Sequence, residues 1–88
     1  MAVVDQLADE LAKTVLEAMD RLDDDRFFEK VSRVVGSTSP TLEEAFLTSI
    51  RIRLADKRAR AFVAKALEAA KTGGEAPKAP SAPPTDSH

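Results

Sequence analysis

The chain has 88 residues, a formal net charge of −2, and no cysteine, so it holds one domain at most and excludes disulfides and thiolate metal sites. Residues 1–5 carry no basic segment, and no apolar run approaches the roughly 18–20 residues of a membrane span. We therefore expect a soluble, cytoplasmic protein with neither a secretory signal nor a membrane helix.

The stretch 3–22 is predicted to be an amphipathic helix. Its apolar residues recur at steps of three and four, which is the spacing of one helix face. They are Val4, Leu7, Ala8, Leu11, Ala12, Val15, Ala18, Met19 and Leu22. Acidic residues occupy most of the other side.

A second helix is predicted over residues 26–35, because the apolar pattern changes phase after Leu22. Asp23, Asp24 and Asp25 suit its N-terminus as caps and as negative charge at the positive end of the helix dipole. Gly36 suits its C-cap.

The three aspartates do not form a calcium loop. If Asp23 were position 1 of such a loop, Phe28 would stand where glycine is needed and Val34 where glutamate is needed. We therefore expect no metal site and no cofactor.

Residues 37–40 form a connector, and a third helix is predicted over residues 42–71, about 45 Å long at ~1.5 Å per residue. Two caps are compatible with its start. Ser39 can cap with Pro40 at the first helical position, or Thr41 can close a capping box with Glu44. Gly73 and Gly74 end the helix.

The third helix has apolar residues on two opposite sides, at ~100° per residue. The early set is Leu42, Phe46, Leu47, Ile50 and Leu54. The later set is centred near the opposite direction and comprises Ile52, Ala55, Ala59, Phe62, Val63, Ala66, Ala69 and Ala70. One neighbouring surface cannot bury both sides of a straight helix. A second subunit is the simplest source of the surface that buries the other side.

The expected architecture is all-α. It is a helical hairpin or three-helix bundle in residues 1–72, with the first two helices antiparallel to a long C-terminal helix. We expect the small later set to meet the first helix, and the bulkier early set to be shared between the second helix and the partner subunit of a homodimer. Adjacent Phe27 and Phe28 point ~100° apart, so one can enter the core while the other meets a partner. The predicted interface residues are Phe28, Phe46, Ile50 and Leu54.

Residues 73–88 are predicted to be a disordered Pro/Ala-rich tail. Their composition cannot bury enough apolar area to offset chain entropy. Pro77 to Pro80 and Pro80 to Pro83 have the PxxP spacing that aromatic grooves can bind. This spacing arises freely in Pro/Ala-rich tails, so we favour a plain solubilising tail.

Charge is distributed unevenly along the chain. Residues 1–25 carry eight acids and two bases, whereas residues 51–71 carry seven bases and two acids. The predicted basic face comprises Arg53, Lys57, Arg58, Arg60 and Lys65. Because the acidic first helix offers these cations a partner within the protein, we favour a solvated or intersubunit face over a nucleic-acid site.

Residues 31–45 partly resemble a helix-turn-helix with Gly36 as the turn glycine. Ser37 stands where an aliphatic residue is usual, and the would-be recognition helix opens with Glu43 and Glu44 and no cation for phosphates. Nucleic acid is therefore not the expected partner.

Catalysis is not expected either, because the sole histidine is His88 in the predicted tail. The sequence favours a non-catalytic protein–protein interaction module, an accessory subunit or adaptor that binds itself and a larger protein. The alternative is a dimeric nucleic-acid-binding regulator that uses the helix-turn-helix-like segment.

Overall fold

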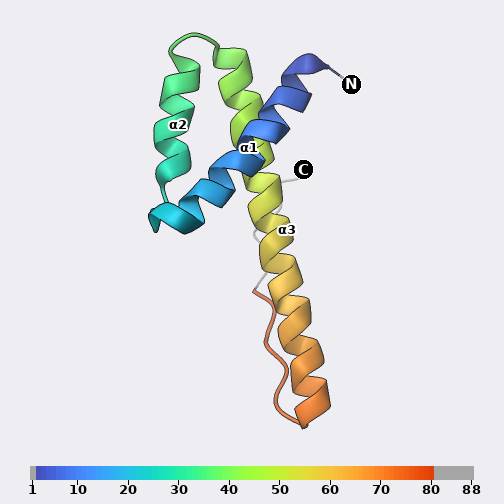
Figure 1. Cartoon of the computed structure of the whole chain (residues 1–88). Coiled ribbons are helices and arrows are strands. Elements are labelled where there is room, and N and C mark those ends of the chain that lie inside the picture. Colours follow the sequence, from blue (N-terminus) through green and yellow to red (C-terminus); the bar gives the residue numbers. More distant parts are fainter. Residues whose placement is uncertain (1, 81–88) are drawn as a thin grey trace. The chain divides into compact units, whose positions relative to one another are not determined.

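The computed structural model describes residues 2–80 and contains three helices in that range, with no strand (Figure 1). They are α1 (Val3–Leu22), α2 (Phe27–Gly36) and α3 (Pro40–Thr72). The predicted all-α class is confirmed, and the helix bounds agree with the predicted ones to within two residues. The chain divides into a first unit, Met1–Asp56, and a second unit, Lys57–His88, and each is described by itself.

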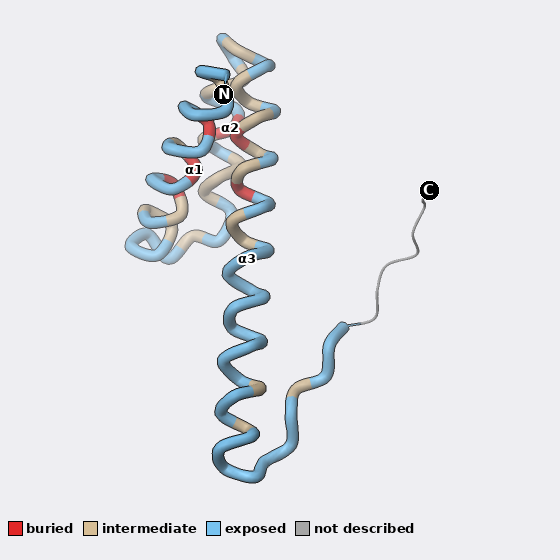
Figure 2. The backbone as a smooth tube through the Cα atoms, turned by 90° about the vertical axis from the view of Figure 1, so that its right-hand side faces the viewer, coloured by how far each residue is buried: buried red, intermediate tan, exposed pale blue. Residues whose placement is uncertain are grey.

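The core of the first unit lies between α1 and the first half of α3. Ala8 and Ala12 are fully buried on α1, and Phe46 and Ile50 are fully buried on α3. Figure 2 shows these positions in red where the two helices cross. The small alanines let the helices approach closely, so that the two large side chains fill the space between them.

The prediction of the aspartates as N-caps of α2 is wrong, because Arg26 is the N-cap and makes no side-chain cap hydrogen bond. Asp23 and Asp24 instead shape the connection between α1 and α2. Asp23 ends α1 in the left-handed conformation, with φ 54°, and its N–H donates to Met19 O at 2.9 Å. The Asp24 carboxylate accepts from the Arg26 N–H at 3.0 Å and from Lys30 Nζ at 3.2 Å. Both contacts favour the ionised form and hold the pKa of Asp24 below its usual value.

The connection between α2 and α3 uses the first of the two predicted caps. Pro40 is the first helical residue, and the Leu42 N–H donates to Ser39 Oγ at 3.0 Å. The prediction of Gly36 as the C-cap is wrong, because Gly36 is the last residue of α2 and Ser37 is the cap. An added Cβ at Gly36 would lie 2.5 Å from Glu43 Oε1, so alanine there requires the flexible end of the Glu43 side chain to shift.

The predicted direction of α1 is also wrong. Figure 1 shows α2 running opposite to α3, as expected, whereas α1 crosses the first half of α3 obliquely and runs toward the same end. The reason is the two short connections. Each reverses the chain, so the first and third helices point the same way.

In the second unit, α3 ends in a glycine cap. Gly73 has φ 75°, and the Gly74 N–H donates to Ala69 O at 2.9 Å, which is the geometry of a Schellman motif. Residues 74–80 contain neither helix nor strand. The rest of the predicted tail, including Pro83 and His88, lies outside the described residues.

Candidate protein-interaction surface

The four predicted interface residues lie in and around the core of the first unit. Phe46 and Ile50 are completely buried within the single chain. Phe28 and Leu54 are half-buried and pack against that core. Phe46 and Ile50 therefore have no accessible area to offer a second subunit.

The side of α3 that packs against α1 is the early side, not the later side as predicted. The early side, with Phe46 and Ile50, packs against Ala8, Ala12 and Val15 of α1. On the later side, Ala55, Ala59 and Phe62 are all exposed, so the pairing of this side with α1 is wrong. Bulk on one helix complements small residues on the other, which is why α1 accepts the phenylalanine and isoleucine.

Arg53 belongs to the first unit and binds α1. Its Nε donates to Asp9 Oδ1 and its Nη2 to Asp9 Oδ2, both at 2.9 Å, in a bidentate pair. Hydrogen bonding from Arg53 holds the pKa of Asp9 below its usual value, and Asp9 raises the pKa of Arg53. This is the pairing of acidic and basic segments that the charge distribution predicts, seen at one contact.

The other residues of the predicted basic face, Lys57, Arg58, Arg60 and Lys65, all lie in the second unit and are exposed. They occupy one side of the helix at residues 57–72. The opposite side carries no charge, and we call it the 57–72 face. Its members are Ala59, Phe62, Val63, Ala66, Leu67, Ala69 and Ala70.

Most of the 57–72 face is exposed to solvent, and only Ala66 and Ala69 are half-buried. The exposed fraction is 36% for Phe62, 53% for Val63 and 62% for Leu67, and no residue of the segment is buried (Figure 2). At 3.6 residues per turn, the seven members fall within an arc of about 160°, and every charged residue of the segment lies outside it. Such segregation is typical of a helix that covers an apolar surface.

Cations border the 57–72 face on both edges. Arg58 and Lys65 fall on one edge, and Arg60 and Lys71 fall on the other, from the helical periodicity. Glu68 is the one acidic residue between 57 and 72, and it falls on the side opposite the face. A shallow hollow of about 360 Å³, lined in part by Ala59, Val63 and Leu67, follows one edge.

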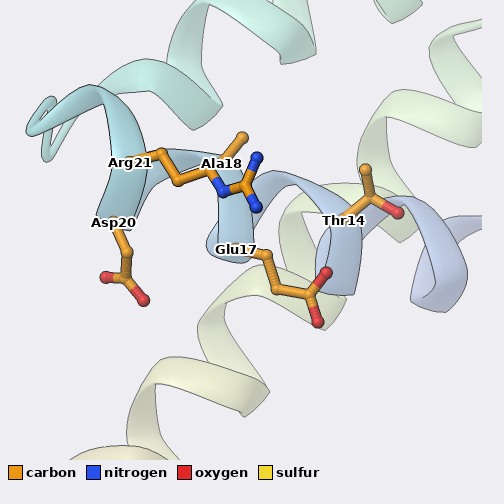
Figure 3. Close-up of a pocket in the computed structure, with 5 residues that line it drawn as sticks. All are labelled: Thr14, Glu17, Ala18, Asp20 and Arg21. Atoms are coloured by element: carbon orange, nitrogen blue, oxygen red, sulfur yellow. The ribbon is translucent and has the colours of Figure 1, made fainter.

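Two other shallow hollows lie on the first unit. Val4, Ala45 and Ile52 contribute to one of about 610 Å³. The other lies along α1 and is lined by Thr14, Glu17, Ala18, Asp20 and Arg21. Figure 3 shows the Glu17 and Asp20 carboxylates of this second hollow pointing in different directions, so they do not converge on one ion.

Chemically reactive groups do not gather at any of these surfaces. Within residues 2–80, no group of three or more His, Cys, Asp or Glu side chains could hold a metal ion. Several hydroxyls serve the backbone instead: Ser32 donates to Glu29 O at 2.8 Å, and Ser37 donates to Val34 O at 2.7 Å. In the same range, no helix combines the length and the apolar character needed to cross a membrane.

The segment that resembles a helix-turn-helix forms an antiparallel hairpin of α2 and α3 (Figure 1). The DNA-binding motif instead joins two helices at a steep angle. Glu44, in the first turns of α3, is exposed, and Glu43 turns toward Gly36. This end of α3 therefore presents a carboxylate, and no cation, where a recognition helix meets phosphates.

Sequence periodicity alone could have located the 57–72 face, since the change of side within α3 is visible in the residue pattern. It could not show which side α1 covers. Comparison of the chain with protein-family models, with curated proteins and with solved structures gives no match in any of the three.

Proposed function

We propose that the protein is a non-catalytic interaction module, an accessory subunit or adaptor that binds another protein through the 57–72 face. The exposure of Phe62, Val63 and Leu67 on one side of a helix carries this proposal. Contiguous apolar patches rimmed by polar residues are uncommon on monomeric soluble proteins and mark binding surfaces. The basic edges of the face supply that rim.

The division of labour within the chain supports the same function. The first unit completes its own core with Phe46 and Ile50, which leaves the later side of α3 without use in folding. A small folded unit that presents a separate apolar helix face suits an adaptor, because binding does not disturb its core.

Homodimerisation is part of the proposal, through a different surface from the expected one. Val3, Leu7 and Ile52 expose 69%, 50% and 63% of their area on the first unit. If this surface joins two copies, sedimentation of the Ile52→Asp variant should show a monomer where the wild type shows a dimer. A wild type that is monomeric at high micromolar concentration would contradict dimerisation and leave the adaptor function intact.

Photo-crosslinking tests the adaptor function directly. A photoreactive amino acid replaces Val63 or Leu67 on the face, or Glu10 on the exposed side of α1 as the matched control. Irradiation in native cell lysate should give protein adducts of discrete mass from positions 63 and 67 and none from position 10. No adduct from either face position, or equal adducts from all three, would contradict the proposal.

The second candidate is a nucleic-acid-binding regulator, favoured by the cations at Lys57, Arg58 and Lys65. Salt separates the two functions. Affinity for random duplex DNA should fall by orders of magnitude between about 50 and 200 mM salt if phosphates are the ligand. An apolar protein interface barely responds over that range. Nuclease-sensitive adducts in the crosslinking experiment would favour this candidate.

A further inference from the structure

The 57–72 face has the spacing of a helix-pairing seam. Ala59, Phe62, Ala66 and Ala69 alternate steps of three and four residues, which is the heptad pattern of helices that pack side by side. In the sequence, Ile52 and Ala55 continue the same register toward the N-terminus. A rod-shaped surface with this spacing fits another helix better than an extended strand.

The relief of the face also fits a helix. Phe62, Val63 and Leu67 are its large exposed side chains. Val63 and Leu67 line the shallow hollow of about 360 Å³ together with Ala59, Arg60 and Ala64. Alternation of large and small side chains accepts the ridges of a second helix. The complementary surface must therefore offer bulky apolar residues at the positions opposite the alanines.

The charges on the edges of the 57–72 face determine which helices can bind it. Arg58 and Lys65 flank the seam on one side and Lys71 on the other. In a helix pair these flanking rows face the flanking rows of the partner, where opposite charges attract and like charges repel. The fitting partner carries aspartate or glutamate beside its apolar seam on both sides.

A second copy of this chain does not supply such a helix. Pairing two 57–72 faces would place base against base along the edges. The acidic helix α1 is no substitute, because Ala8, Ala12 and Val15 of its apolar face are already buried in its own unit. The partner is thus a different chain.

We infer that the 57–72 face binds an acidic amphipathic helix of another protein, an inference that rests on the proposed adaptor function. An anionic membrane is the other surface that attracts a basic amphipathic helix. Binding to lipid scales with buried apolar area, and four of the seven members of the face are alanines that bury little. The observations therefore favour a protein helix.

The test measures binding of the full chain to two fluorescein-labelled synthetic helices by fluorescence anisotropy. Both probes carry leucine at the seam positions of about three heptads. One carries glutamate in the flanking rows, and the other carries lysine. The glutamate probe should bind at least about tenfold more tightly at low salt, and the difference should shrink as salt screens the edges.

Three variants locate the contact, and circular dichroism checks that each keeps its helix content. Leu67→Asp should abolish binding of the glutamate probe. Lys57→Asp changes a residue away from the edges and should weaken binding by less than about threefold. The double variant Arg58→Glu with Lys65→Glu makes one edge acidic and leaves Lys71 on the other, so it should abolish the preference for the glutamate probe.

Each other result overturns the inference. Equal binding of both probes would show that the edges do not select charge, and a preference that survives the double variant would place the contact elsewhere. If neither probe binds but the chain sediments with phosphatidylserine vesicles, the face is a membrane surface. If nothing binds while positions 63 and 67 still crosslink to protein, the adaptor function stands and the acidic-helix partner is excluded.

Discussion

Phe46→Ala should remove most of the stability of the first unit. Phe46 is fully buried, and it is one of only two large side chains among the five apolar residues of that core. Phenylalanine-to-alanine changes in cores cost about 3–5 kcal/mol. A single core of this size supplies only about 3–5 kcal/mol in total. The variant is therefore expected to be largely unfolded at 25 °C.

Phe62→Ala is the matched control, because it removes the same atoms from a side chain that is 36% exposed on the 57–72 face. Substitutions at exposed sites change the free energy of unfolding by about 0.5 kcal/mol or less. Because part of the Phe62 side chain is covered, Phe62→Ala should lower this free energy somewhat more, but far less than Phe46→Ala. Urea unfolding followed by circular dichroism measures both, since the chain has no Trp or Tyr for fluorescence. Ile50→Val, with an expected loss of about 0.5–1.5 kcal/mol, keeps a measurable transition when Phe46→Ala does not fold.

Equal losses for Phe46→Ala and Phe62→Ala would refute the assignment of the core to the first half of α3. A wild-type unfolding midpoint that rises with protein concentration would show that association contributes to stability. In that case, loss of this concentration dependence in the Phe62→Ala variant would identify the 57–72 face as the surface of association.

Three further outcomes follow from local contacts. Gly36→Ala should cost about 1 kcal/mol or less, because the clashing atoms belong to the flexible end of Glu43, and a gain in stability would show that the carboxylate moves freely. The pKa of Asp9 is lowered in the folded protein, so its pairing with Arg53 stabilises the fold above the unfolded pKa and is lost as pH falls through the folded value. The melting temperature should therefore decrease as the pH is lowered below about 4. Asp9→Asn should weaken this pH dependence of the melting temperature in the wild type but not in an Arg53→Gln background. Gly73→Ala places a side chain on a residue with φ 75°, which should destabilise the helix cap by about 1 kcal/mol. Circular dichroism should show this as a lower helix content.

Local signals were sufficient to place the helices. Ser39 and Gly73 mark the ends of α3 as predicted, because their preferences act within a few residues. Asp23 is predicted as an N-cap of the second helix and instead ends α1. Amphipathic spacing identified Ala8, Ala12 and Val15 as one face of α1, and all three are buried. These predictions depend only on neighbours in the chain.

Long-range choices were not determined by the same signals. Both sides of α3 are apolar enough to meet α1, and periodicity does not say which one does. The choice depends on how volumes match across the crossing, with Phe46 and Ile50 against alanines. For the same reason, periodicity predicts an interface at Phe46 and Ile50, which are buried, whereas Phe62, Val63 and Leu67 are the exposed apolar residues.

The composition of residues 57–72 bears on why this face exists. Thirteen of its sixteen residues are Ala, Leu, Lys, Arg or Glu, which are strong helix formers, so the segment needs little packing to remain helical. The exceptions are Phe62, Val63 and the terminal Thr72. Phe62 and Val63 form helix less readily, and neither is buried in this chain. Neither helix propensity nor the core of the first unit accounts for these two side chains, and the proposed partner contact would account for both.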